Sequence, residues 1–134
     1  MKRLWTGIFM AMFFLSRSPT HAAAVDDLLN QYRAQGSKPF DPAEGKGAWN
    51  RKVENREAGE ARSCSGCHGA DLRQPGKHLQ TGKVIDPMAP SVNSKRLTDP
   101  AFIEKWLKRN CQWTFGRPCT LHEKGTFLSF ILSQ

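Results

Sequence analysis

Hydrophobic side chains recur at helical spacing in several short segments of this chain of 134 residues. Leu28, Leu29 and Tyr32 fall on one face of a helix that the pattern predicts over residues 25–35, and Gly36 suits the end of that helix. No segment alternates apolar and polar residues over a length that would indicate a strand. The pattern therefore predicts an all-α domain.

The second predicted helix begins with Asp41 and Pro42, which are residue types typical of the N-cap and of the first helical position. Gly45 and Trp49 follow within it, one helical turn apart. Residues 51–62 are almost entirely polar, so we expect a surface loop there.

Two further helices are predicted towards the carboxyl terminus. One starts with Asp99 and Pro100 and is expected to end near Arg109. Thr120 and Glu123 have the spacing of a capping box, which predicts the start of the last helix. The apolar stripe of this last helix consists of Phe127, Leu128, Ile131 and Leu132.

The first 24 residues have the pattern of an export signal. Lys2 and Arg3 precede an apolar run over residues 4–15, and the alanines at 22–24 suit a cleavage site. The alternative is a membrane anchor, for which the apolar run is short. The sequence thus predicts a cleaved signal peptide at 1–24, one domain at 25–134, and export to the periplasm.

The chain is moderately basic, with a formal net charge of +8 at pH 7. Removal of Lys2, Arg3 and Arg17 with the signal would lower this charge by three, to +5. The basic residues are spread along the chain, which suits docking to an acidic partner protein. No dense basic block with interleaved aromatic side chains occurs, so we expect that the protein binds no nucleic acid. We also expect a monomer.

The chemistry of the chain is concentrated in the string Cys64-Ser65-Gly66-Cys67-His68. This Cys-x-x-Cys-His spacing is the attachment motif of a c-type haem. Each thiol bonds one vinyl group of the porphyrin, and the histidine supplies a nitrogen to the iron. The alternatives are a redox-active cysteine pair and half of a zinc site. Export favours one covalent haem c, because bacterial haem attachment takes place outside the cytoplasmic membrane.

A helix with Gly45 and Trp49, then the haem motif, then a closing amphipathic helix resembles a class I cytochrome c. In that fold the first and last helices cross near a glycine with an aromatic residue one turn away. Phe127 or Phe130 would be the partners of this pair at the crossing. The resemblance implies a small class I cytochrome c-like fold around one covalent haem.

The sequence Ala89-Pro90 resembles the proline turn of class I cytochromes c. In those proteins the proline carbonyl accepts a hydrogen bond from the second nitrogen of the ligand histidine. Such a bond fixes the tautomer and the orientation of the imidazole. The resemblance therefore implies that Pro90 orients His68.

Four side chains are candidates for the sixth position on the iron: Met88, His78, His122 and Asn110. Met88 follows His68 by twenty residues and adjoins the proline turn, which favours a packing role. His78 lies in a basic loop and His122 in a first helical turn, and both positions are typical of surface histidines. Asn110 ends the predicted third helix on its apolar face, where it suits either an iron ligand or a C-cap.

Cys111 and Cys119 bracket a short loop directly after Asn110. In an exported protein such a pair is expected to form a disulfide. The alternative is a zinc site that uses all four cysteines, and it requires that Cys64 and Cys67 carry no haem.

From residue 63 to the carboxyl terminus the chain resembles the sphaeroides haem protein family, a group of oxygen-binding monohaem cytochromes c. The resemblance implies that Asn110 is the sixth ligand of the oxidised haem and that Cys111 pairs with Cys119. It also implies two electron-transfer partners, a dihaem cytochrome c and a membrane cytochrome b. Besides the haem motif and the proline turn, it rests on Thr81-Gly82-Lys83, Arg109-Asn110-Cys111, Gly116-Arg117 and Cys119.

The sequence therefore predicts a periplasmic c-type cytochrome that exchanges single electrons. A small diatomic ligand, oxygen or nitric oxide, is expected to bind at the ferrous haem after the Asn110 amide is released, because ferrous iron prefers softer ligands than an amide oxygen. The alternative is a plain electron carrier with Met88 as the distal ligand. No catalytic residue is assigned, and a small redox enzyme acting on oxygen or nitric oxide is the weaker third interpretation.

Overall fold

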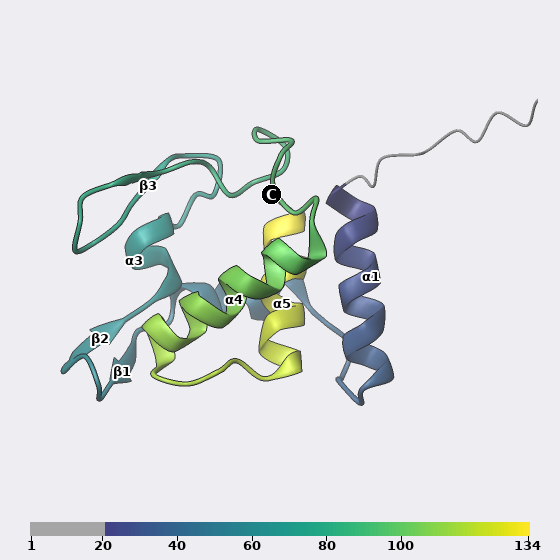
Figure 1. Ribbon diagram of the computed structural model, residues 1–134, viewed down its shortest axis with the longest axis horizontal. Helices are drawn as coiled ribbons and strands as arrows, with labels where there is room; N and C mark the ends of the chain where they lie inside the picture. Colours follow the sequence, from purple (N-terminus) through teal and green to yellow (C-terminus); the bar gives the residue numbers. More distant parts are fainter. Residues whose placement is uncertain (1–20) are drawn as a thin grey trace, which may run out of the picture.

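The computed structural model describes residues 21–134 (Figure 1). In this part of the chain helices dominate, which confirms the predicted all-α class. The helices are α1 (His21–Ala34), α2 (Pro42–Asn50), α3 (Cys64–His68), α4 (Pro100–Phe115) and α5 (Leu121–Leu132). Two small antiparallel hairpins are formed by β1 (Val53–Asn55) with β2 (Glu60–Arg62) and by β3 (Gly76–Lys77) with β4 (Val84–Ile85).

The amino-terminal helix starts earlier than its pattern predicts. Residues 1–20, which carry most of the predicted signal peptide, lie outside the described residues. Helix α1 already includes residues 22–24, and both Ala24 and Val25 are buried. Within residues 21–134 no helix is both long enough and apolar enough to cross a bilayer.

The centre of the fold is the crossing of α2 and α5, which the resemblance to class I cytochromes c predicts correctly. Asp41 caps α2, as expected, because its side chain accepts a hydrogen bond from the backbone N–H of Ala43 at 2.8 Å. A Cβ atom on Gly45 would clash with the carbonyl oxygen of Thr126 and lie 2.8 Å from Cβ of Phe130. Only glycine therefore permits this close approach of the two helices.

Aromatic rings fill the space beside the crossing. The ring centroid of Trp49 lies 6.1 Å from that of Phe127 and 5.9 Å from that of Phe130, both in edge-to-face contact. Such pairs stabilise a core by about 0.5–1.5 kcal/mol beyond the area they bury. The predicted capping box is also present: Thr120 and Glu123 bond reciprocally at the start of α5.

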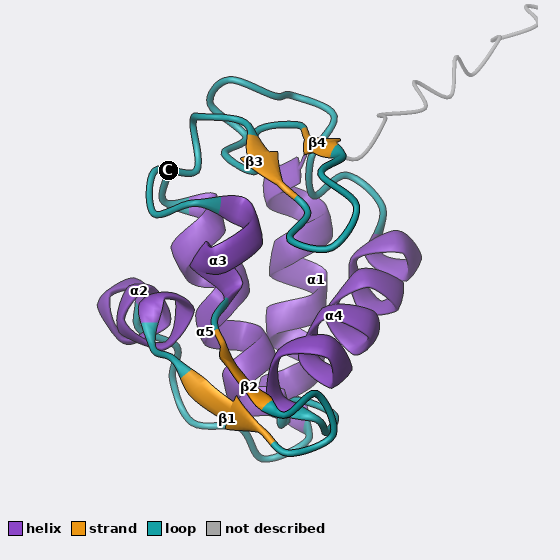
Figure 2. Ribbon diagram, turned by 90° about the vertical axis from the view of Figure 1, so that its left-hand side faces the viewer, coloured by secondary structure: helices purple, strands orange, loops and turns teal. Residues whose placement is uncertain are grey.

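A partly buried polar network joins α1, α4 and α5. The hydroxyl of Tyr32 donates a hydrogen bond to the carboxylate of Glu104, and Nζ of Lys124 lies 2.6 Å from the same carboxylate. Tyr32 is only 2 % exposed, and its burial beside Glu104 raises the pKa of its hydroxyl. Each polar group in this network has a partner, which offsets the cost of its burial. Figure 2 shows α1 and α4 beside α5 from the side.

The prediction of a surface loop over residues 51–62 is wrong, because strands β1 and β2 form a hairpin there. Its turn is built locally: Oδ1 of Asn55 accepts hydrogen bonds from the backbone N–H groups of Glu57 and Ala58, and Gly59 takes a positive φ of 67°. The residues that the hairpin buries are Asn55 and Arg62, not apolar side chains. The pattern of hydrophobic residues therefore does not predict this hairpin.

The predicted end of the third helix near Arg109 is also wrong. Helix α4 continues to Phe115, and Gly116 ends it in the left-handed conformation with a φ of 66°. Gly116 bonds back to the carbonyl of Gln112, as a C-cap residue does. Asn110 consequently lies inside the helix, and the alternative in which it is the C-cap is excluded.

Candidate haem site

The haem motif forms the short helix α3, which follows strand β2 and is followed by Gly69. The side chain of Ser63 caps this helix by accepting a hydrogen bond from the N–H of Gly66 at 3.1 Å. Gly69 ends it with a positive φ of 76°. Both Cys64 and Cys67 are free, half-buried thiols. The motif thus presents two thiols and one imidazole within little more than a helical turn.

The imidazole of His68 is held in a form that can bind a metal. Its Nδ1 atom is buried and has no hydrogen-bond partner. The Trp49 ring lies beside it, with a centroid distance of 5.4 Å, and is anchored by a 3.0 Å hydrogen bond from its Nε1 to the Gly69 carbonyl. Burial, together with the nearby charges of Arg96 and His78, lowers the pKa of His68 to about 4. The ring is therefore neutral at pH 7, as coordination requires.

The predicted hydrogen bond from His68 to the Pro90 carbonyl is not formed, because Nδ1 of His68 has no partner. The proline turn is tied to the neighbouring segment instead. The backbone N–H groups of Met88 and Ala89 both donate to the carbonyl of Leu72, each at 2.9 Å. Leu72 lies four residues after His68. The turn is therefore joined to the segment that follows α3 but does not hold the imidazole itself.

Helix α4 is in direct contact with the haem motif. The side chain of Thr114, which is only 3 % exposed, faces the thiol of Cys64 and acts to lower the pKa of that thiol. Burial is the main cause that raises the pKa of Cys64 to about 12. This contact fixes which face of α4 is turned towards α3.

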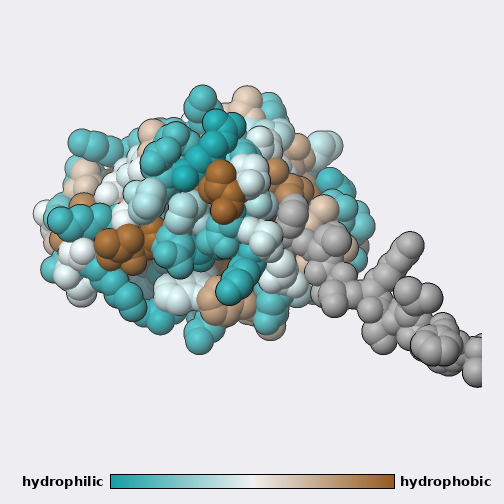
Figure 3. All heavy atoms as spheres, turned by 90° about the horizontal axis from the view of Figure 1, so that it is seen from above, coloured by the Kyte–Doolittle hydropathy of each residue, from teal (hydrophilic) through white to brown (hydrophobic). Residues whose placement is uncertain are grey.

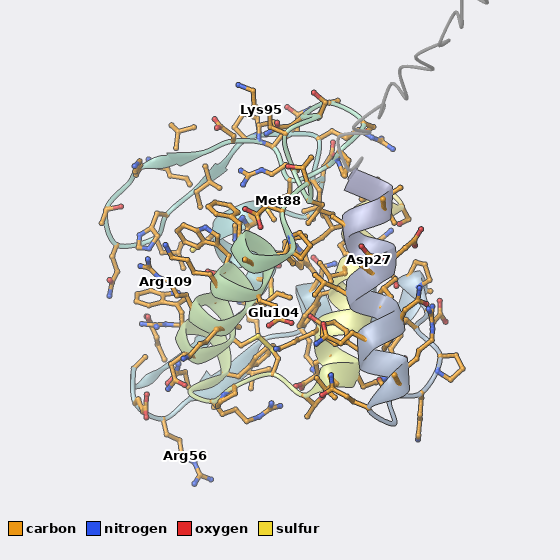
Figure 4. The ribbon with its side chains drawn as sticks, turned by 45° about the vertical axis from the view of Figure 1, so that its right-hand side comes forward. Asp27, Arg56, Met88, Lys95, Glu104 and Arg109 are labelled. Carbon is orange, nitrogen blue, oxygen red and sulfur yellow. A yellow bond between two sulfur atoms is a disulfide. The ribbon has the colours of Figure 1, made fainter. Side chains whose placement is uncertain are left out.

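Asn110 lies on that face, one helical turn before Thr114. Its side chain is half-buried, and no hydrogen bond engages its amide in the described part of the chain. Its neighbour Arg109 is exposed; Figure 4 shows Arg109 at the left of the α4 ribbon and Met88 above that ribbon. The structure thus presents an unengaged amide one turn from the contact with Cys64.

The other three candidates for the sixth ligand lie in different surroundings. Met88 is half-buried and packs against the hydrophobic core, as its predicted packing role requires. His78 was expected at the surface but is half-buried, and its ring lies 5.5 Å from that of Trp113. His122 lies on α5, where its Nε2 is 3.0 Å from the carboxylate of Glu44.

Cys111 and Cys119 form a disulfide with a Cα–Cα distance of 5.5 Å, which is the pairing that the resemblance implied. The bridge joins α4 to the loop before α5 directly after Asn110. The alternative zinc site made of four cysteines is excluded, because two of the four are joined to each other. Among residues 21–134 no cluster of three or more histidine, cysteine or acidic side chains could hold a metal ion.

Two residues of the hairpin β1–β2 support the site and were missed by the sequence analysis. Nδ2 of Asn55 and Nη1 of Arg62 both donate to the carbonyl of Trp113, at 2.8 Å and 3.0 Å. The guanidinium of Arg62 also lies 3.7 Å from the centroid of the Trp113 ring. Because Arg62 is followed directly by Ser63, the N-cap of α3, this clamp joins the haem motif to the end of α4. No motif or hydrophobic period marks these polar residues in the sequence.

These residues fit a covalently bound haem. Cys64 and Cys67 would form the thioether links, and the neutral imidazole of His68 would supply the nitrogen to the iron. The helical fold and this set of donors define a small c-type cytochrome.

Comparison with known proteins identifies the group of cytochromes. A family described as a domain of unknown function, DUF1924, matches residues 35–131. The chain is 38% identical over 107 residues to the cytochrome c-type protein SHP of Cereibacter sphaeroides, covering 80% of this chain and 81% of that protein. The chain belongs to the sphaeroides haem protein family, as its motifs predict.

Solved structures agree with this assignment. The structure of oxidized SHP, described as an oxygen binding cytochrome c, matches with a TM-score of 0.73 and 37% identity over 82% of this chain and 96% of that one. The crystal structure of oxidized cytochrome c'' from Methylophilus methylotrophus matches with a TM-score of 0.72 and 31% identity, covering 83% and 94%. A solution structure of cytochrome c'', described as giving insights into haem-ligand detachment, has a TM-score of 0.72 at 29% identity, covering 85% and 93%. All three support the class I-like fold.

Proposed function

We propose that this protein is a periplasmic c-type cytochrome that exchanges single electrons and binds a small diatomic gas, oxygen or nitric oxide, after the Asn110 amide has left the iron. The observation that carries the proposal is the position of Asn110. It lies on the face of α4 that is turned towards Cys64 at Thr114, and within residues 21–134 its amide has no hydrogen bond that would hold it elsewhere. A bound haem c would supply an iron that changes between the ferric and ferrous states and accepts diatomic ligands.

His68 and Trp49 form the constant side of the proposed site. His68 is neutral, and its ring is packed against Trp49, which a hydrogen bond to Gly69 holds in place. Because His68 is held in place, an exchange of ligands would take place at another position on the iron. Cys64 and Cys67 would hold the porphyrin on the protein whatever further ligand binds the iron.

Asn110 is the exchangeable group. An amide oxygen is a neutral, hard donor, which suits ferric iron better than ferrous iron. Reduction should therefore weaken its bond, and no competing hydrogen bond has to break for the side chain to swing aside. Once released, the amide N–H₂ group of Asn110 could donate a hydrogen bond to a gas molecule in the site.

The named relatives support both parts of this proposal. Oxidized SHP is described as an oxygen binding cytochrome c, and the solution structure of cytochrome c'' is described in terms of haem-ligand detachment. We propose the same sequence of events for this chain, with Asn110 as the ligand that detaches. We further propose that a dihaem cytochrome c and a membrane cytochrome b exchange electrons with it, and that it acts as a monomer.

The second candidate function is a plain electron carrier with Met88 as a permanent sixth ligand. One observation favours it: the Met88 side chain is half-buried, and its backbone N–H donates to the carbonyl of Leu72, four residues after His68. In such a carrier the iron would keep six ligands in both oxidation states. The two candidates therefore differ in whether a gas reaches the ferrous iron.

The absorption spectrum of the reduced holoprotein, recorded with and without carbon monoxide, separates the two. We expect a shift of the Soret band on addition of carbon monoxide, because Asn110 no longer blocks the site. An unchanged spectrum with a persistent methionine–iron charge-transfer band in the ferric protein would show that Met88 is the ligand.

A further inference from the structure

The hairpin β3–β4 lies directly on the haem-attachment helix. Gly76 begins this hairpin and is packed so closely on α3 that a Cβ atom there would clash with the carbonyl of Cys67 and lie 2.9 Å from Cα of His68. A Cβ atom on Gly66 would lie 3.5 Å from Cδ1 of Leu79, which belongs to the turn of the same hairpin. A molecule bound to this hairpin is therefore held against the segment that carries Cys67 and His68.

The outer side of the hairpin combines apolar and basic side chains. Leu79 is 59 % exposed and Val84 is 66 % exposed, and the exposed Lys77 and Lys83 adjoin them. Residues 76–85, from the start of β3 to the end of β4, include Lys77 and Lys83 and no aspartate or glutamate. We call Lys77, Leu79, Lys83 and Val84 the hairpin patch. The upper side of the molecule, where β3 runs in Figure 1, shows separate hydrophobic groups among mostly hydrophilic side chains in Figure 3.

The backbone holds the hairpin patch in one arrangement. The N–H of His78 donates to the carbonyl of Lys83, and the N–H of Gly82 donates to the carbonyl of His78, both at 2.9 Å. Gly82 takes the positive φ of 68° that this turn requires. The ring of His78 is packed against Trp113 of α4. A surface fixed in this way loses little conformational entropy when a partner binds.

We propose that the hairpin patch is the docking surface for an acidic redox protein that exchanges one electron with the haem. This docking proposal depends on the electron exchange that the proposed function assigns to the protein. Apolar side chains bordered by lysines, with no carboxylate in the segment, complement a negatively charged partner. A second copy of this chain would bring the same positive charges and be repelled. The position of the patch over α3 places such a partner beside the residues that hold the haem.

Binding can be measured without any turnover. Oxidised flavodoxin, an acidic one-electron protein, is titrated into the oxidised, ¹⁵N-labelled holoprotein at low ionic strength. We expect amide shift changes centred on the hairpin patch, and we expect high salt to suppress them because the charges are exposed. Shift changes centred on another surface would overturn the proposal.

Charge variants distinguish an effect of the hairpin patch on electron transfer from an effect of the net charge of the whole protein. With reduced flavodoxin as the electron donor, Lys77→Glu/Lys83→Glu should lower the second-order rate of haem reduction about tenfold or more at low salt. The matched control, Lys38→Glu/Lys46→Glu, makes the same charge change at two exposed positions near and in α2 and should lower this rate less than about twofold. Reduction by hydroquinone, which is small and uncharged, should be unchanged in both. Equal losses in the two charge variants would show that only net charge matters.

The apolar centre is tested with Leu79→Ser/Val84→Ser, which keeps every charge. This variant should bind flavodoxin more weakly at all salt concentrations and keep the haem spectrum of the parent. Unchanged binding would overturn the role of the apolar pair, and self-association of the parent that this variant abolishes would assign the patch to a second copy instead. The titration does not depend on gas binding, so its failure is distinct from a failure of the carbon monoxide experiment.

Discussion

Replacement of Arg62 by leucine tests whether the hairpin β1–β2 holds the haem motif and α4 together. Arg62 is 8 % exposed, donates to the Trp113 carbonyl at 3.0 Å, and stacks on the Trp113 ring at 3.7 Å. Its ion pair with Glu60 contributes little, because the Glu60 side chain is 57 % exposed. Leucine fills part of the same volume but can replace neither polar contact.

The size of the effect follows from the two lost contacts. A hydrogen bond from a charged group is worth about 1.5–3 kcal/mol, and a desolvated cation–π contact about 1–2 kcal/mol. Leucine recovers part of this by its own burial. We therefore expect Arg62→Leu to lower the free energy of unfolding by about 2–4 kcal/mol. The measurement is guanidinium unfolding of the oxidised holoprotein, followed by far-ultraviolet circular dichroism.

The control is Arg56→Leu in the turn of the same hairpin. Figure 4 shows Arg56 extending away from the molecule, and its side chain is exposed. This change should cost less than about 0.5 kcal/mol. Because Arg62 also fixes the segment of α4 that follows Asn110, Arg62→Leu should raise the high-spin fraction of the ferric spectrum, and Arg56→Leu should not. Equal stabilities and equal spectra of the two variants would refute the clamp.

Three further changes test other parts of the fold. Gly45→Ala should destabilise the protein by about 1–3 kcal/mol or more, since the added methyl group meets the Thr126 carbonyl and Phe130 across the helix crossing, and a melting temperature equal to the parent's would contradict that close approach. Replacement of Cys111 and Cys119 by serine should cost about 2–3 kcal/mol, as expected for the short loop they close, and thiol counting of the parent should find neither cysteine free. Glu123→Gln should cost less than about 1 kcal/mol at neutral pH, because glutamine keeps the capping hydrogen bond and loses only the ion pair with the half-exposed Arg117. The hydrogen-bonded salt bridge to Arg117 lowers the pKa of Glu123, so ionised Glu123 contributes fully to stability above the ordinary carboxyl pKa, and this contribution is lost as the pH falls through the lowered pKa. If Glu123→Gln destabilised the protein equally at acidic and neutral pH, this account would be contradicted.

The sequence predicts those parts of the fold in which single residues have a specific local task. Asp41, Asp99 and Thr120 mark the starts of three helices, and each accepts the capping hydrogen bond that its type suggests. The crossing of α2 and α5 is implied by the resemblance of Gly45 and Trp49 to the helix crossing of class I cytochromes c. The haem motif is equally local, so its residues could be assigned before the fold was known.

The remaining features depend on contacts between distant segments. The hairpin β1–β2 buries Asn55 and Arg62, which are polar, and their partner is a carbonyl of α4 more than fifty positions away. The extent of α4 is set by Gly116, and the sequence between Arg109 and that glycine contains no residue that would end a helix. The place of the proline turn depends on the hydrogen bonds of Met88 and Ala89 to Leu72, which no local pattern encodes.

The most direct test of the central claim compares Asn110→Ala with Met88→Leu, each as oxidised and reduced holoprotein. The measurement is the ferric electron paramagnetic resonance spectrum together with the rate of carbon monoxide binding to the ferrous protein. Asn110→Ala should keep its covalent haem, change the ferric spectrum, and bind carbon monoxide faster, because no internal group has to leave first. Met88→Leu should match the parent in both measurements. A silent Asn110→Ala, with an altered spectrum in Met88→Leu, would contradict the account and assign the protein to the plain electron carriers.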